Sequence, residues 1–321
     1  MARLIESVVG HSAEIQRLFN LKKSGRWPHA LLFVGPSGVG KKKIALAFAQ
    51  MLVCPNDPEA CGVCGPCLRM AKQQSESLTI IQPDPDAAKE VIKVDAIRDL
   101  LENLSFASLG SARVVLIDQA NTMNPQASNA LLKTLEEPFE NVYFILLGDD
   151  VRGFMPTIRS RAQVVRFSTL GEIDLKKIKP GLPEWAYYGS RGQLDQLETL
   201  TSTDGIERRE EALKLFEQFC EDPQFLLSSP WKTQAKDRVQ AQFNIKTWLQ
   251  VIRDLIVLKT QAQSFVLNTD QVVRLKKLYQ IQSKKLFKLA ENLVQAEQSL
   301  KGNADAVLVF ESLWVKYARV D

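Results

Sequence analysis

Short apolar runs of four to six residues recur along the first half of the chain and alternate with stretches of helical spacing. The runs cover residues 30–34, 78–81, 113–117, 142–147 and 163–167, and the helical stretches cover 41–49, 94–106 and 125–137. An uninterrupted apolar run is typical of a strand buried on both faces, and strands that alternate with helices form parallel sheets. We therefore predict an α/β domain with a parallel sheet that helices cover on both faces.

The pattern changes after residue 167, where the strand-like runs stop. Residues 168–203 contain clusters of chain breakers at 180–183 and 189–192, which predict a small helical domain. From residue 204 onward, apolar side chains recur at helical spacing, for example Leu213, Phe216 and Cys220, and Cys220 is expected to be a core residue. We predict three domains, over residues 1–167, 168–203 and 204–321, of which the third is all-helical.

Length and composition fit this division and exclude several protein classes. A chain of 321 residues exceeds what one hydrophobic core usually serves. With 45% hydrophobic and 24% charged residues, it is not collagen-like, low-complexity or disordered. No apolar run approaches the roughly 18 residues that cross a bilayer. Glu6 also interrupts the start of the chain where a signal peptide would stay apolar, so we expect a cytoplasmic protein.

Charge is nearly balanced overall but uneven along the chain. The 41 basic and 37 acidic residues give a net charge of +4. Residues 271–290 carry no acid and six basic residues, which are Arg274, Lys276, Lys277, Lys284, Lys285 and Lys288. Such a stretch can bind nucleic-acid phosphates. A DNA-binding module is therefore one hypothesis, and a solvated helix face or an acidic protein neighbour is the alternative.

A glycine-rich loop follows the first predicted strand. Gly35, Gly40 and Lys41 have the spacing of a phosphate-binding loop, with Gly38 between them. In such a loop backbone N–H groups and the start of the next helix hold phosphates, and the lysine reaches the terminal ones. The next position, where a hydroxyl would bind Mg²⁺, is Lys42, which cannot bind a cation. We expect ATP or ADP to be possible ligands and Mg²⁺-dependent hydrolysis to be doubtful.

An acid ends the third apolar run. Asp118 is placed as the carboxylate that holds the metal in nucleotide-hydrolysing sites, and an exposed aspartate at a strand end is the alternative. The following position would carry the acid that polarises the attacking water, but it is Gln119. An amide cannot accept that proton, and loss of a general base typically costs about 10²–10⁴-fold in rate.

Four of the five cysteines lie within fourteen consecutive positions: Cys54, Cys61, Cys64 and Cys67. Four thiolates match the tetrahedral coordination of a closed, structural zinc site. An iron–sulfur cluster and unliganded cysteines are the alternatives, and the six-residue first gap is unlike the ferredoxin spacing. We predict a zinc module over residues 54–67.

The segment Asn129-Ala-Leu-Leu-Lys-Thr-Leu-Glu-Glu-Pro138, followed by a strand and Arg159-Ser160-Arg161, closely resembles bacterial clamp-loader subunits of the AAA+ superfamily. Val9-Gly10-His11 looks like the family's box beside the adenine, and the cysteine insertion is similar to its zinc module. Gly189 and Ser190 look like part of the third helix of its lid. The resemblance implies a P-loop AAA+ domain, a helical lid and a helical collar that oligomerises.

The resemblance also implies a function and partners. Clamp loaders are rings of five subunits that open a sliding clamp for primed DNA, with motor subunits called gamma or tau and a delta subunit. Each ATP site is completed by an arginine finger from the neighbouring subunit, and Arg161 matches that finger. Such an arginine contributes on the order of 10³–10⁵ in rate. The alternative for Arg161 is a solvated residue before a strand.

Departures from the family pattern distinguish its members. Lys42 and Gln119 replace hydrolytic groups, Gly148 replaces a polar sensor, and Gly192 replaces the lid arginine of motor subunits. A subunit that lost these groups but kept the finger resembles the family's non-hydrolysing stator. A gamma/tau-like motor ATPase with unusual substitutions is the alternative.

Overall fold

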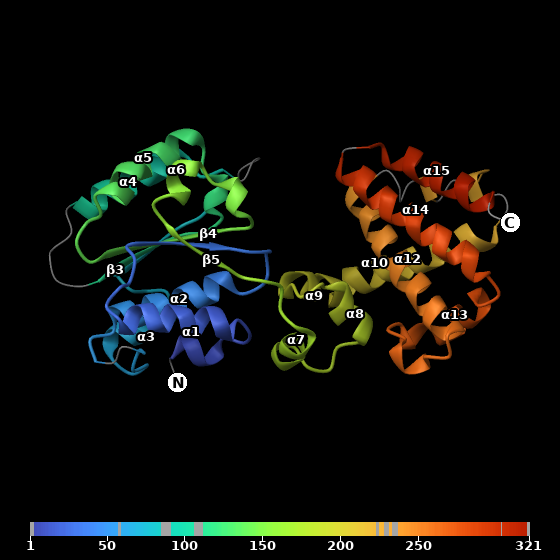
Figure 1. Ribbon diagram of the computed structural model, residues 1–321, viewed down its shortest axis with the longest axis horizontal. Helices are drawn as coiled ribbons and strands as arrows, with labels where there is room; N and C mark the ends of the chain where they lie inside the picture. Colours follow the sequence, from blue (N-terminus) through green and yellow to red (C-terminus); the bar gives the residue numbers. More distant parts are fainter. Residues whose placement is uncertain are drawn as a thin grey trace. The chain divides into compact units, whose positions relative to one another are not determined.

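The computed structural model describes residues 3–56, 59–84, 91–105, 112–222, 225–227, 231–232, 237–302 and 304–319. The chain divides into two compact units, Met1–Ile178 and Lys179–Asp321 (Figure 1). The predicted domain 168–203 is thereby split between the units, and the borders at 167 and 203 stay predictions. No helix among the described residues is long and apolar enough to span a membrane.

A five-stranded parallel sheet forms the first unit, in the order β2-β3-β4-β1-β5. Its strands are β1 Ala30–Val34, β2 Leu78–Ile81, β3 Arg113–Ile117, β4 Val142–Gly148 and β5 Gln163–Arg166. Each predicted apolar run became a strand, and β4 and β5 end within one residue of the predicted positions. All five side chains of β1 are buried, as expected for a strand paired on both sides.

Helices cover both faces of this sheet (Figure 1). One layer holds α1 Ser12–Lys23, α2 Lys41–Val53 and α3 Gly65–Ala71, and the other holds α4 Val94–Ser105, α5 Pro125–Glu136 and α6 Pro156–Arg159. Alternate residues of β1 pack on opposite faces of the sheet, with Leu31 and Phe33 in one core and Leu32 and Val34 in the other. The predicted α/β fold is confirmed.

Helix prediction was less complete. Helices α1 and α3 were not predicted: α1 fully buries only Leu18, and α3 is short, with Cys67 and Met70 buried. Periodicity is hard to recognise in α3, which has seven residues. Helix α4 ends at Ser105, while the predicted end at Phe106 lies outside the described residues. Helix α7 Glu172–Ile178 closes the first unit.

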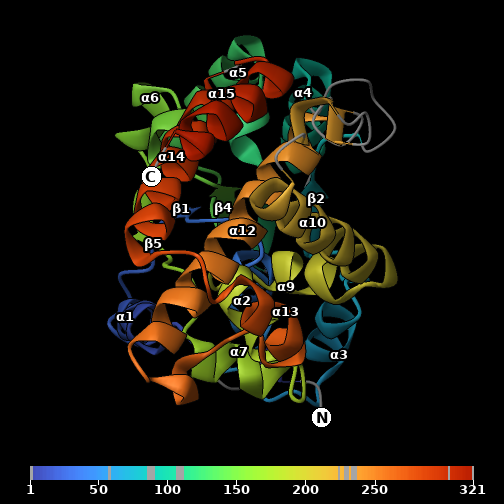
Figure 2. The same cartoon turned by 90° about the vertical axis from the view of Figure 1, so that its right-hand side faces the viewer.

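The described elements of the second unit are all helical (Figure 2). They include α8 Glu184–Gly189, α9 Leu194–Thr201, α10 Thr203–Glu221, α12 Arg238–Lys259, α13 Val272–Leu278, α14 Ser283–Lys301 and α15 Ala306–Ala318. Helix α12 packs against α10 and α14, and α15 packs on α14. Gly189 is the last residue of α8 and Ser190 follows it, and their likeness to the third helix of a lid stays a prediction.

Aromatic side chains fill the core of the second unit. Phe216, Trp248 and Phe310 are fully buried, and the Trp248 indole N–H donates to the Ala212 carbonyl at 2.8 Å. Cys220 is half-buried against this core, as predicted, and burial raises the pKa of its thiol to about 12. The apolar helical spacing in the sequence therefore identified core positions correctly.

A buried polar network fixes the connection after α12. Asp254 is fully buried and accepts hydrogen bonds from the backbone N–H groups of Leu267, at 3.1 Å, and Asn268, at 2.7 Å. Arg209 on α10 donates to Asn268 at 2.7 Å and lies 3.9 Å from the centre of the Trp185 ring. The network thus ties α8 and α10 to the segment that follows α12.

We predict that Asp254→Ala lowers the free energy of unfolding of the second unit by about 3 kcal/mol, because it leaves buried N–H donors without an acceptor. Urea unfolding followed by tryptophan fluorescence measures this, since four of the five tryptophans lie in that unit. Glu291→Ala is the control, because the exposed Glu291 pairs with exposed Lys288; its effect should stay below about 1 kcal/mol. Equal effects of the two substitutions would contradict the prediction.

Candidate functional site

The glycine-rich loop joins the end of β1 to the start of α2. Gly38 and Gly40 have left-handed backbones, with φ of 66° and 96°. A Cβ at Gly35 would lie 2.2 Å from the Phe167 carbonyl oxygen. These positions therefore require glycine. The Gly40 N-cap of α2 has no side-chain hydrogen bond, and the start of the helix after such a loop is where phosphates bind.

Lys41 folds over this loop. Its ammonium donates to the carbonyls of Gly35, at 2.5 Å, and Pro36, at 2.8 Å, and lies 3.5 Å from the Asp149 carboxylate. Asp149 follows β4, the strand beside β1. Asp149 was not among the predicted site residues, although an acid directly after a neighbouring parallel strand is a pattern that can indicate such a site. The lysine is thus held at the mouth of the loop by one acid.

Lys42 forms an ion pair with the acid predicted to hold a metal. Its Nζ lies 3.0 Å from Asp118 Oδ2 and donates to Gln82 Oε1 at 3.3 Å. Asp118 follows β3, and Gln82 follows β2. Sequence analysis identified Lys42 and Asp118 separately but did not foresee that they pair. The sheet order explains the contact, because β2 and β3 end on the same edge as β1.

Gly192, another of the predicted departures, belongs to the second unit, whereas the remaining two lie at this edge. The Gln119 side chain is exposed, and its backbone N–H donates to Asp118 Oδ1 at 3.0 Å. Gly148, at the end of β4, accepts a hydrogen bond from the Gly35 N–H at 3.2 Å. A Cβ at Gly148 would lie 2.4 Å from the Phe154 ring. The aromatic ring therefore occupies the space where a sensor side chain would begin.

The segment Val9-Gly10-His11 reaches the same loop. The His11 Nε2 lies 2.9 Å from the Val39 carbonyl, and its ring meets Phe167 edge-on at 5.1 Å. Gly10 has φ of 80°, and a Cβ there would lie 2.7 Å from Leu170. Val9 is half-buried. The fold thus brings the segment Val9-Gly10-His11 to the glycine-rich loop. A role for Val9 beside the adenine of a nucleotide stays a prediction.

Arg161 lies at the opposite edge of the sheet. It precedes Gln163, which is level with Leu31 in the parallel pairing. Leu31 comes four residues before Gly35, a separation of about 13 Å at about 3.3 Å per residue. The Arg161 guanidinium donates to a Glu136 carboxylate oxygen and, at 3.0 Å, to the Thr157 carbonyl. An arginine placed there does not reach its own loop.

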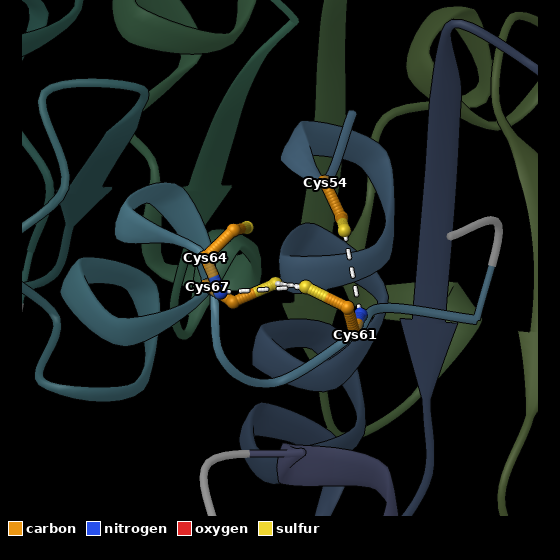
Figure 3. A group of neighbouring side chains, drawn as sticks. All are labelled: Cys54, Cys61, Cys64 and Cys67. Carbon is orange, nitrogen blue, oxygen red and sulfur yellow. Dashed lines mark hydrogen bonds between the residues drawn. The ribbon is translucent and has the colours of Figure 1, made fainter. Parts of the chain in front are cut away.

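The four clustered cysteines converge on one point (Figure 3). Cys54 ends α2, Cys61 lies in the loop, and Cys64 and Cys67 belong to the start of α3. Their sulfur atoms lie within 4.8 Å of one another. A tetrahedral site with Zn–S bonds of about 2.3 Å requires sulfur separations of about 3.8 Å. The four thiols therefore fit a single metal ion.

Hydrogen bonds and burial act in opposite directions on the thiols of this cluster. Backbone N–H groups of Val63 and Cys64 lower the pKa of Cys61 to about 6, whereas burial raises that of Cys67 to about 12. The cluster is also joined to the start of the chain. Arg3 donates to the Ala60 carbonyl at 2.7 Å, and buried Gln50 donates to the Cys67 carbonyl at 2.9 Å. The cysteine loop thus supports the segment that leads to Val9.

The basic stretch 271–290 is partly neutralised within the chain. The Arg274 guanidinium lies 2.8 Å from a Glu210 carboxylate oxygen and 3.2 Å from a Glu217 oxygen, both on α10. Lys285 lies over the Tyr317 ring at 4.4 Å. These partners could not be predicted from the basic stretch, because they lie on other helices. Arg274 is therefore engaged internally, which weakens the DNA-binding hypothesis.

Comparison with known proteins identifies the family of this chain. The family described as "DNA polymerase III, delta subunit" matches residues 10–171. The chain belongs to this family. It is 38% identical over 136 residues to DNA polymerase III subunit delta' of Pseudomonas aeruginosa, a match that covers 41% of each chain. The resemblance to clamp-loader subunits in the sequence is confirmed.

Two further relatives of this DNA polymerase III family member come from Escherichia coli. The chain is 34% identical to subunit delta' over 155 residues, which is 47% of this chain and 46% of that protein. It is 40% identical to subunit tau over 157 residues, which is 48% of this chain and 24% of that protein. The matches therefore span less than half the length of each of these relatives.

We predict that this family member binds one zinc ion per chain and loses it when Cys61 is replaced by Ser. Elemental analysis of the purified proteins measures the metal, with Cys220→Ser as a control that retains it. Removal of the metal should also lower the melting temperature, because the ion joins α2 to α3. Iron in place of zinc, or no metal in the unaltered chain, would contradict the prediction.

Proposed function

We propose that this chain is a stator subunit of the delta' kind in the clamp loader of DNA polymerase III. It presents Arg161 to ATP bound on a neighbouring motor subunit and does not hydrolyse ATP itself. One observation carries the proposal: Asp118 at the loop edge is paired with Lys42, whereas Arg161 lies at the other edge of the sheet. The site's own hydrolytic groups are disabled, and the arginine is placed to act elsewhere.

The proposed partners follow from the family. The chain joins gamma/tau motor subunits and a delta subunit in a hetero-pentamer, through an all-helical collar over residues 204–321. Through that complex it serves the loading of the sliding clamp onto primed DNA in the cytoplasm. The names of the relatives, subunits delta' and tau of DNA polymerase III, support this assignment. The gamma/tau-like motor alternative is not favoured, because Gln119 and Gly148 lack the groups that hydrolysis needs.

Arg161 changes partner when it acts. In the isolated chain its guanidinium is paired with the Glu136 carboxylate, and their side chains are 32% and 49% exposed. A half-exposed ion pair of this kind contributes at most about 1 kcal/mol. Phosphate oxygens of a neighbour's ATP carry more negative charge than one carboxylate, so they displace Glu136. The arginine then stabilises the charge that develops on the transferred phosphoryl group.

We expect Arg161→Ala, in a reconstituted ring, to slow ATP turnover at the adjoining site by about 10³-fold or more. Total ATPase of the ring should fall by the share of that site, and clamp loading should fall with it. Arg98→Ala is the control, because Arg98 is an exposed arginine on α4 whose ion pair is with exposed Asp95. A ring with full activity would contradict the proposal, as would ATP turnover by the isolated chain that Lys41→Ala abolishes.

We also expect Glu136→Gln to free the arginine before docking. The affinity of the chain for an ATP-loaded motor subunit should rise by up to about fivefold, the equivalent of about 1 kcal/mol. Titration by fluorescence anisotropy measures it. Glu137→Gln is the matched control, since Glu137 is the exposed neighbour on the same helix end. Weaker binding by the Glu136 variant alone would show that Glu136 supports Arg161 in the complex.

A further inference from the structure

Lys42 extends from the first turn of α2 to the ends of β2 and β3, where it contacts Gln82 and Asp118. We propose that its ammonium is the resident cation of this loop, so that a nucleoside di- or triphosphate binds here without a divalent metal. The inference deepens the proposed loss of hydrolysis. It names the ligand class of the chain's own site and the residue that determines its metal dependence.

Mg²⁺ does not fit the oxygen atoms at this edge. It requires near-octahedral oxygen ligands at about 2.0–2.1 Å, and position 42 offers a nitrogen cation instead of a hydroxyl. The Asp118 carboxylate lies 3.0 Å from that ammonium, which is close to a charge-assisted hydrogen bond. The amide oxygen of Gln82 accepts from the same group. A metal ion bound to Asp118 would have to displace the Lys42 ammonium from the carboxylate, and it would still lie close to that positive charge.

The second acid at the mouth of the loop is also engaged. Asp149 lies 3.5 Å from Lys41, so an acid lies beside each of the two loop lysines. The pairs cancel in charge before a ligand arrives. A divalent ion would add two positive charges next to both ammonium groups, and Coulomb repulsion at such short range opposes this. The charge balance therefore also disfavours the metal.

The same geometry leaves the loop able to hold phosphate. An ammonium has three N–H donors, and Asp118 and Gln82 account for two of those on Lys42. The third can donate to a phosphate oxygen held by the N–H groups at the start of α2. Lys41 can exchange the Gly35 and Pro36 carbonyls for phosphate oxygens. Two lysines then place two positive charges at the phosphates, where a lysine and Mg²⁺ would place three in a hydrolytic site.

The test is calorimetric titration of the full chain with ATP and with ADP, in buffer containing Mg²⁺ and in magnesium-free buffer. Chelators are avoided, because they would also attack the cysteine cluster. For the unaltered chain the affinity should agree within about twofold between the buffers. Lys42→Thr restores a hydroxyl next to Asp118, and its affinity should rise by about tenfold or more on adding Mg²⁺.

Two further variants keep the result unambiguous. Lys43→Thr is the matched control: Lys43 is the next lysine, donates to the Ser7 carbonyl, and should leave binding metal-independent. Asp118→Asn should also retain metal-free binding, because the proposal gives Asp118 no metal to hold. This variant serves if Lys42→Thr does not fold.

Two results would overturn the proposal. One is an affinity of the unaltered chain that rises tenfold or more with Mg²⁺, and the other is no binding of ATP or ADP in either buffer. Failure of the stator proposal would appear separately, as a reconstituted ring indifferent to Arg161→Ala, because that assay does not depend on Lys42.

Discussion

The pairing of β1 with β4 on one side and β5 on the other is the interaction on which the first unit depends. Because all five strands run parallel, every strand ends at one edge of the sheet and begins at the other. The glycine-rich loop, Asp118 and Asp149 therefore gather at one edge. Arg161, which precedes β5, falls at the opposite one. The sheet thus places the glycine-rich loop and Arg161 at opposite ends of its strands.

Three of the cations at these two edges are each paired with an acid of the same chain. Lys41 is paired with Asp149, Lys42 with Asp118, and Arg161 with Glu136. All are partly exposed, so the pairs are weak enough for a phosphate to compete. The difference lies in position: the lysines face the chain's own loop, whereas the arginine faces away from it. The cysteine cluster adds a third element, because it supports the segment that leads to Val9.

Local patterns sufficed for features whose residues are close in the chain. The strands were predicted almost to the residue, because strands buried on both faces read as uninterrupted apolar runs. The four cysteines were found for the same reason, since a short loop can bring them together without help from the rest of the fold. Helices α1 and α3 were missed, because little of α1 is fully buried and α3 is too short to show periodicity.

By itself the sequence determined the α/β order of elements, the loop with Lys41 and Lys42, and the family to which they belong. Only the tertiary structure decided which acids meet which cations. Asp118 lies 76 residues beyond Lys42, and the order of the parallel strands brings them together. Glu136 lies 25 residues before Arg161, and the packing of α5 against α6 brings them together. Arg274, apparently unopposed in its stretch, meets Glu210 and Glu217 of another helix. Ion pairs form between groups that are close in space, so a pattern along the chain can identify charged residues but cannot predict which of them pair.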